Sequence, residues 1–280
     1  MIKKIIKKFI RVKKEKVLIP TLMSELLKNK VALITGGSSG IGYAIAKAFI
    51  QNGATVIITG RNDEKLKNAQ IKLIEECNCD ATNIFYEILD VTEVKNIKIV
   101  LERITKVLNK RIDIFVNNAG INGGDVCPIT KEEDYDRILD TNLKGMYFMS
   151  QEIVEYMIKN KIKGNILNVT SSSSLRPAIS PYMLSKWGER GLTLGLAKKY
   201  LPYGIIVNGI APGSTATPML MKEDTNDLNC DYALTGRYIA PEEIGNIATM
   251  LVSDMGKMII GDTIYITGGA GVITFDDMNY

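Results

Sequence analysis

The chain contains no histidine, so it lacks the side chain that most often transfers protons near neutral pH. Cysteine is scarce as well, with four in 280 residues, too few for a disulfide framework. Cys77 and Cys79 stand one residue short of the Cys-x-x-Cys spacing of redox and zinc pairs. These absences argue against a metal site and a disulfide scaffold, and they favour a reducing cytoplasmic compartment.

A net positive charge is confined to the N-terminus. Residues 1–30 carry ten lysines and arginines against two acids, a net charge of +8, whereas the rest carries 25 against 29, a net charge of −4. A body with that balance does not have the composition of a nucleic-acid-binding surface. With 46% hydrophobic residues, the chain can bury a substantial core. We expect one folded domain over 30–280, preceded by an extension over 1–29.

The extension begins with a basic amphipathic pattern. Lysines and an arginine occupy one side of the expected helix. Apolar residues recur at helical spacing on the other side: Ile2, Ile5, Ile6, Phe9 and Ile10. Lysines interrupt every apolar run well short of the roughly 18 residues of a membrane span, and they leave no signal-peptide core. The pattern predicts a helix that lies peripherally on the anionic inner membrane surface or docks on a partner, through residues 1–20. A solvated or oligomer-packed extension is the alternative.

The body alternates short β-rich apolar runs with helical stretches. The expected strands are 31–35, 54–60, 83–91, 112–120, 164–170, 204–213 and 262–269. The first expected helix is closed by Gly53, and the second runs from Asn62 to about Cys77. Strands that alternate with helices imply parallel crossovers. The predicted fold class is therefore α/β, a doubly wound parallel sheet with helices on both faces (a Rossmann fold) in a single domain.

A glycine-rich turn follows the first expected strand and opens the first expected helix. It reads Thr35-Gly36-Gly37-Ser38-Ser39-Gly40-Ile41-Gly42. Small residues let the backbone approach a pyrophosphate, and the helix points its first N–H groups at it. Glycine also serves any tight turn, so the position of the motif carries the prediction of a dinucleotide site.

Tyr182 and Lys186 stand four residues apart, the spacing that places two side chains on one face of a helix. Tyrosine, with an ordinary pKa near 10, is a poor acid or base at pH 7. A lysine ammonium one turn away favours the phenolate and lowers that pKa. In isolation the two residues would more simply share a polar helix face. The nucleotide turn upstream favours an acid–base pair.

These motifs together resemble the short-chain dehydrogenase/reductase family, over residues 28 to 272. Further matches follow in family order: Asp90 in LDVT, NNAG at 117–120, Asn142 in TNLKG, VNGIAPG at 207–213 and a late TGG. Within the family the chain is most similar to the 3-oxoacyl-carrier-protein reductase type. The resemblance implies an NAD(P)-dependent carbonyl reductase or alcohol dehydrogenase that transfers hydride between NADP(H) and a small-molecule carbonyl or secondary alcohol. It also implies a cytoplasmic homo-oligomer, either a dimer or a tetramer, without a metal.

The resemblance assigns proton transfer to Tyr182, the nicotinamide ribose to Lys186 and a relay water to Asn142. The register of the strand end makes Ser171 the expected substrate-binding serine, with Ser172 and Ser173 as alternatives. The expected cofactor-binding residues, besides Tyr182 and Lys186, are Gly36, Ser38, Ser39, Gly40, Ile41, Gly42, Arg61, Asp90, Val91, Asn118, Ala119, Gly120, Pro212, Gly213, Thr215 and Thr217.

Arg61 follows the second expected strand, where NAD-dependent proteins usually place an acid. A guanidinium there can bind a 2′-phosphate through two hydrogen bonds. NADP(H) is therefore the expected cofactor. NAD(H) is the alternative because Asp63 is close by, and Arg61 could instead be an exposed residue at the start of a helix.

The segment 214–240 is expected to cover the substrate, as it does in the family. It is partly apolar, with Met219, Leu220, Met221, Leu228, Tyr232, Leu234 and Tyr238. The same side chains could pack a helical hairpin or a subunit contact. The sequence does not separate an acyl thioester from a sugar derivative, a steroid or a small ketone.

Two other functions stay open: a non-catalytic nucleotide sensor, which typically loses the tyrosine or lysine, and an epimerase or reductase of sugar nucleotides, which usually carries a longer C-terminal domain.

Overall fold

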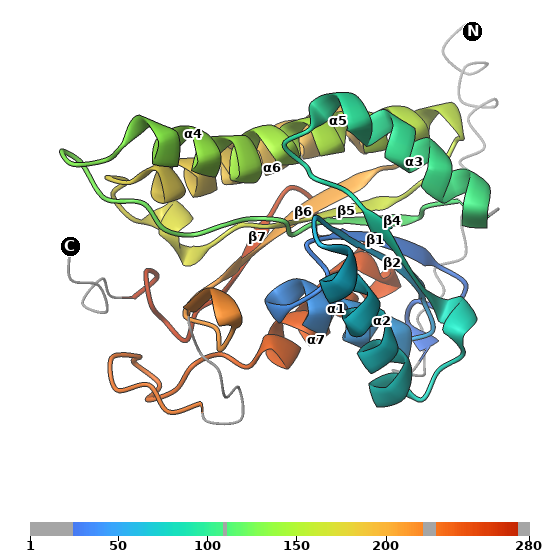
Figure 1. Cartoon of the computed structure of the whole chain (residues 1–280), viewed down its shortest axis with the longest axis horizontal. Coiled ribbons are helices and arrows are strands. Elements are labelled where there is room, and N and C mark those ends of the chain that lie inside the picture. Colours follow the sequence, from blue (N-terminus) through green and yellow to red (C-terminus); the bar gives the residue numbers. More distant parts are fainter. Residues whose placement is uncertain (1–24, 109–110, 221–227, 274–280) are drawn as a thin grey trace, which may run out of the picture.

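The computed structural model describes residues 25–108, 111–220 and 228–273. Within these ranges seven strands form one parallel sheet in the order β3-β2-β1-β4-β5-β6-β7 (Figure 1). The strands are β1 Val31–Thr35, β2 Thr55–Gly60, β3 Ile84–Ile88, β4 Ile114–Asn117, β5 Asn165–Val169, β6 Ile206–Pro212 and β7 Thr263–Ile266. The prediction of a doubly wound α/β sheet is confirmed.

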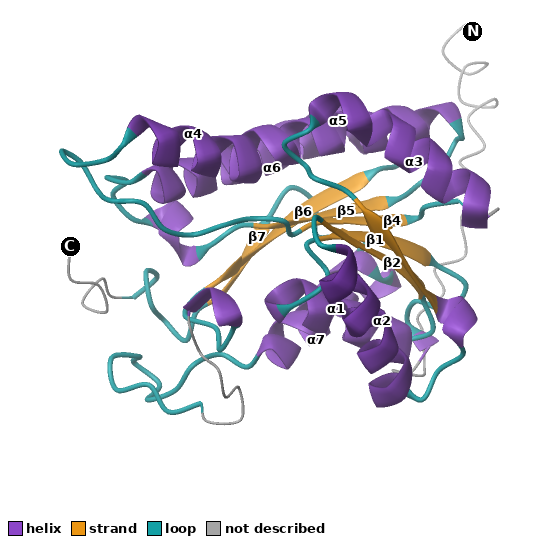
Figure 2. Cartoon of the chain, in the orientation of Figure 1, coloured by secondary structure: helices purple, strands orange, loops and turns teal. Residues whose placement is uncertain are grey.

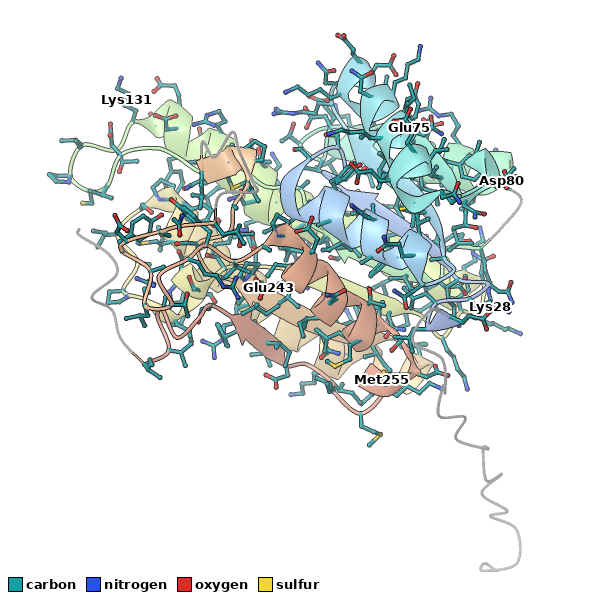
Figure 3. All side chains as sticks on the ribbon, turned by 90° about the horizontal axis from the view of Figure 1, so that it is seen from below. Lys28, Glu75, Asp80, Lys131, Glu243 and Met255 are labelled. Carbon is teal, nitrogen blue, oxygen red and sulfur yellow. The ribbon has the colours of Figure 1, made fainter. Side chains whose placement is uncertain are left out.

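Helices cover both faces of the sheet (Figure 2). On the lower face in that view lie α1 Gly40–Gln51, α2 Asp63–Cys77 and α7 Pro241–Val252, and on the upper face lie α3 Val94–Leu108, α4 Glu132–Leu139, α5 Gly145–Lys159 and α6 Pro181–Tyr200. Figure 3 views the molecule from below and shows α7 beside α1, with Glu243 in the first turn of α7.

Each face of the sheet has its own apolar core. The lower core gathers Ile45 and Phe49 of α1 with Ile244 of α7, and the upper core gathers Ile97 of α3 with Ile153 of α5. The central strand β1 is buried at every position. Burial on both faces explains why the strands read as continuous apolar runs, without the alternation of a half-exposed strand.

Local signals set the helix ends that position the site. Gly53 takes a positive φ of 85° just after α1, as expected of a residue that closes a helix. Asn62 accepts a hydrogen bond from the backbone N–H of Lys65 at 2.9 Å and so caps α2. Ser180 accepts from the backbone N–H of Met183 at 3.2 Å and caps α6, whose first residue is Pro181.

Packing begins before the expected start of the domain. Leu27 is 1% exposed within the lower core, and its backbone N–H donates to the Asn52 carbonyl at 2.9 Å. The packed chain thus begins before the domain start expected at residue 30. The charged residues around Leu27 hide this packing in the sequence. The amphipathic pattern of residues 1–20 lies outside the described residues. Among the described helices, none is long and apolar enough to cross a membrane.

Candidate active site

A cleft of about 380 Å³ lies at the carboxyl ends of the strands. The chain leaves β1 for β2 and β3 on one side and returns to β4 on the other. Loops that start from adjacent strands therefore diverge there and leave room for a ligand. Residues that follow each of the strands β1 to β6 line the cleft: Gly36, Arg61, Leu89, Asn118, Thr170 and Gly213.

The glycine-rich turn forms one wall of the cleft, through Gly36, Ser38, Ser39, Gly40 and Ile41. Gly36 and Gly40 have positive φ values of 65° and 56°, which other residues rarely adopt. The side chain of Ser39, just before α1, makes no capping hydrogen bond. The first N–H groups of α1 are thus available to an anionic ligand such as a pyrophosphate.

Gly42 does not line the cleft, although it was expected to bind the cofactor. A Cβ added there would lie 2.4 Å from both the Gly36 carbonyl oxygen and the Asn118 side-chain nitrogen. Asn118 donates from that nitrogen to the carbonyls of Thr35 at 2.9 Å and Gly36 at 3.0 Å. Gly42 therefore lets the turn after β1 and the loop after β4 pack against each other, which keeps the wall of the cleft in shape.

The end of β2 brings two basic side chains to the cleft. Arg61 lines it as expected, together with Lys65 of the first turn of α2, and both are exposed. Sequence reasoning missed Lys65. The signal was present, since a residue in the first turn of a helix capped by Asn62 points back toward the strand end. Asp63, the nearby acid, does not line the cleft.

Tyr182 and Lys186 line the opposite part of the cleft from α6. Lys186 Nζ lies 5.5 Å from the centre of the Tyr182 ring, which is half-buried. The same nitrogen lies 3.5 Å from the Val169 carbonyl oxygen at the end of β5. The predicted pair is thus brought together beside the strand ends, with its charge close to the phenol.

Behind Lys186 lies an acid that the sequence analysis did not single out. Glu189 Oε1 and Oε2 accept hydrogen bonds from Lys186 Nζ at 2.8 and 2.9 Å, and the Glu189 side chain is fully buried. Burial disfavours the Lys186 ammonium, but the Glu189 carboxylate outweighs it, and the pKa of Lys186 is raised. Burial raises the pKa of Glu189 to about 7 although Lys186 opposes the shift.

Of the three candidate serines, Ser171 alone lines the cleft within the described chain. It lies two residues after the end of β5, and its Oγ accepts a hydrogen bond from the backbone N–H of Ser173 at 3.1 Å. Ser172 and Ser173 belong to the short helical turn Ser172–Leu175, which leads away from the cleft.

Asn142 is fully buried and does not line the cleft. It lies in a π-helical turn, Asp140–Lys144, between α4 and α5. Its amide accepts from the Ile121 backbone N–H at 2.8 Å, donates to the Ile121 carbonyl at 3.0 Å, and donates to Ser185 Oγ at 3.1 Å. The side chain thus joins the loop after β4 to α6, and its neighbour Thr141 faces the cleft.

The remaining expected cofactor residues all line the cleft: Asp90, Val91, Ala119, Gly120, Pro212, Thr215 and Thr217. Of the expected lid, Met219 and Leu220 line it, whereas Leu228, Tyr232, Leu234 and Tyr238 do not, and Met221 lies outside the described residues. The Tyr232 hydroxyl instead donates a hydrogen bond to the Tyr238 hydroxyl at 3.0 Å. No group of three potential metal ligands occurs among the described residues.

Comparison with known proteins agrees with this geometry. The family model of the short chain dehydrogenases matches residues 30–228. The chain is 37% identical over 247 residues to a 3-oxoacyl-[acyl-carrier-protein] reductase of Thermotoga maritima, covering 87% of this chain and 98% of the relative. It is 31% identical to glucose 1-dehydrogenase 2 of Bacillus subtilis, covering 87% and 95%.

Among solved structures, the chain resembles an actinorhodin polyketide ketoreductase with NADPH. The TM-score is 0.78 at 25% identity, with 90% of this chain and 99% of the other covered. A match of this length, to a family whose motifs gather around one cleft of the fold, leads to one conclusion: the chain is a member of the short-chain dehydrogenase family of oxidoreductases.

Proposed function

We propose that this protein is an NADP(H)-dependent reductase of a ketone, able to oxidise the corresponding secondary alcohol. The observation that carries the proposal is the meeting of two sets of residues in one cleft. The glycine-rich turn suits a dinucleotide, and Tyr182, Lys186 and Ser171 suit proton transfer to a carbonyl oxygen. A nucleotide sensor would have no use for the second set.

The residues divide the work by their chemistry. The nicotinamide cofactor, when bound, supplies or accepts the hydride. The Tyr182 phenol holds the proton that a reduced carbonyl oxygen takes up, and the Lys186 ammonium stabilises the phenolate left behind. The Ser171 hydroxyl, on the same side of the cleft, can donate a hydrogen bond to that oxygen and orient it.

The preference for NADP(H) is supported by charge. Arg61 and Lys65 are both exposed at the end of β2, whereas the acid Asp63 does not line the cleft. Two cations suit a 2′-phosphate, and at this strand end the described lining of the cleft includes no carboxylate to accept from a bare ribose hydroxyl.

The substrate class is inferred from the relatives and from the lid. Two of the similar proteins are named for the reduction of ketones on acyl chains. Met219, Leu220 and Ile121 line the cleft and suit an apolar chain beside the reacting carbonyl. We therefore propose a 3-oxoacyl compound or a related apolar ketone.

A homo-oligomer in the cytoplasm completes the proposal. Leu184, Trp187 and Leu194 are each more than two-fifths exposed and recur at helical spacing along the outer side of α6. Such a row on one helix is typical of a surface that a second copy covers. Light scattering measures the assembly directly.

Substitution of Tyr182 by phenylalanine tests the catalytic proposal. The ring keeps its packing while the proton donor is lost, so we expect turnover of a 3-oxoacyl thioester to fall by about 100-fold or more, with NADPH binding retained. NADPH absorbance reports turnover, and cofactor fluorescence reports binding. Tyr203→Phe, on the exposed surface, is the matched control and should keep full activity. Equal rates in wild type and Tyr182→Phe would refute the mechanism.

A further inference from the structure

The buried Glu189 carboxylate has no part in the mechanism described so far, yet it contacts the catalytic lysine. Lys186 Nζ has three N–H donors, and Glu189 takes two of them. The third faces the Val169 carbonyl oxygen at 3.5 Å. Glu189 thus holds the ammonium in one place, on the side away from the cleft.

In the described structure the charges of Lys186 and Glu189 act on each other, and Tyr182, also in α6, acts on Lys186. The neighbouring elements contribute neutral groups. Strand β5 supplies the Val169 carbonyl and the Asn168 amide, which donates to Thr193 Oγ1 at 2.9 Å. The π-helical turn supplies the Asn142 amide. Tyr182, Lys186 and Glu189 therefore form one unit on α6, in which the Lys186 ammonium lies between the phenol ring and the carboxylate.

The charge balance of this unit decides how readily the phenol loses its proton. With Glu189 ionised, the charges of the phenol, the ammonium and the carboxylate sum to zero, and loss of the phenol proton leaves the unit with a net charge of −1. Without the carboxylate, the same loss takes the unit from +1 to zero. The carboxylate therefore opposes phenolate formation, because it offsets the ammonium that would stabilise it.

We propose that Glu189 is a positioning residue that holds Lys186 and sets the pH range over which Tyr182 keeps its proton. The inference rests on the proposed function, in which Tyr182 is the acid of ketone reduction and its phenolate is the base of alcohol oxidation. Glu189 extends to higher pH the range in which Tyr182 is a proton donor, and thereby favours reduction near neutral pH.

The first test is the pH profile of Glu189→Gln (E189Q), which keeps the size and a hydrogen-bond acceptor but removes the charge. We expect the rising limb of alcohol oxidation to move about one to two pH units lower, as expected for loss of a charge a few ångströms away. At a pH on that limb the variant should oxidise the alcohol about tenfold faster than the wild type. The falling limb of ketone reduction should likewise move to lower pH. Glu189→Ser, with room for a water, is a second neutral variant with the same expected shift.

Two controls separate this role from a structural one. Glu189→Asp keeps the charge, so its limb should stay near that of the wild type. Glu155→Gln makes the same chemical change on the exposed side of α5 and should leave the profile unchanged. Profiles of E189Q and Glu189→Ser that superimpose on the wild type would overturn the proposal while leaving the proposed reaction intact.

A second readout needs neither cofactor nor turnover. Tyrosinate absorbance is titrated in wild type and E189Q, each with and without Tyr182→Phe. The chain has twelve tyrosines, and subtracting the curve of the Tyr182→Phe variant from that of its parent isolates the signal of Tyr182. The isolated step should occur at lower pH in E189Q. If the wild type reduces no ketone, the proposed function fails and this titration still decides the role of Glu189. An unshifted step contradicts that role.

Discussion

Glu189 is predicted to make the stability of this protein fall as the pH rises from 5 to 8. Burial raises the pKa of its carboxyl from an ordinary 4.5 to about 7 in the folded chain. Because the folded pKa lies above the unfolded one, the folded state binds this proton more tightly. The stability that the proton contributes is complete below about pH 4.5 and is lost as the pH rises through 7.

The size of the effect follows from the shift. A shift from 4.5 to about 7 corresponds to a loss of about 3 kcal/mol in the free energy of unfolding over this window, as an upper value. The other shifted groups act elsewhere. Asp80 and Glu243 have lowered pKa values and lose stability only in acid, whereas the raised pKa values of Lys186 and Cys77 act only in alkali.

Denaturant unfolding at fixed protein concentration and at several pH values between 5 and 8 provides the measurement. The single tryptophan, Trp187, is a convenient reporter because it lies in α6 and donates from its indole nitrogen to the Arg176 carbonyl at 2.8 Å. We expect the wild type to lose stability across the window and E189Q to be flat, with Glu155→Gln behaving like the wild type. Parallel pH dependence in E189Q and the wild type would show that the carboxyl titrates normally, against the reasoning above.

Two further predictions concern the cofactor and the N-terminus. Arg61→Ala is expected to raise the KM for NADPH by about 10- to 100-fold and to change the KM for NADH little, and Lys65→Ala should act in the same direction. Each substitution removes a charge-assisted contact to the 2′-phosphate worth about 1.5–3 kcal/mol. Equal effects on both cofactors in steady-state assays would contradict the assignment. Deletion of residues 1–20 should leave turnover intact, because the first strand of the sheet, β1, begins only at Val31. The deletion should also abolish salt-sensitive co-sedimentation with anionic vesicles, to which each cation contributes about 1 kcal/mol. Full-length protein that stays in the supernatant at low salt would rule out the membrane surface.

The strands were predictable because each is a short run of buried apolar residues between turn signals. Their ends were less so. The run 112–120 contains the four-residue β4, Ile114–Asn117, since the chain leaves the sheet at Asn118 to form the wall of the cleft. Apolar and small residues continue through such a loop because it packs against a neighbour, and composition alone does not distinguish packing from strand pairing.

The site was predictable where its residues are contiguous in sequence. The glycine-rich turn and the pair Tyr182 and Lys186 are found from spacing, because a turn or a helix fixes which side chains lie together. Gly42, in the glycine-rich turn, and Asn142, in TNLKG, also belong to motifs but support the cleft from behind. Lys65 reaches the cleft from outside any motif. Which side of a turn faces the ligand depends on packing from other elements, which no local pattern records.

Glu189 shows the same limit in a sharper form. Its spacing from Lys186 fits a pair on the surface of a helix, which ordinarily contributes little. In the fold, this side of α6 is turned inward, and the pair is buried instead. A buried ion pair is costly to desolvate, and an apolar side chain would fill the place of Glu189 at lower cost if Lys186 were dispensable. Lys186 is needed as an ammonium beside Tyr182. The carboxylate accepts two hydrogen bonds from the Lys186 ammonium and holds it in place, while it limits how strongly that charge acts on the phenol.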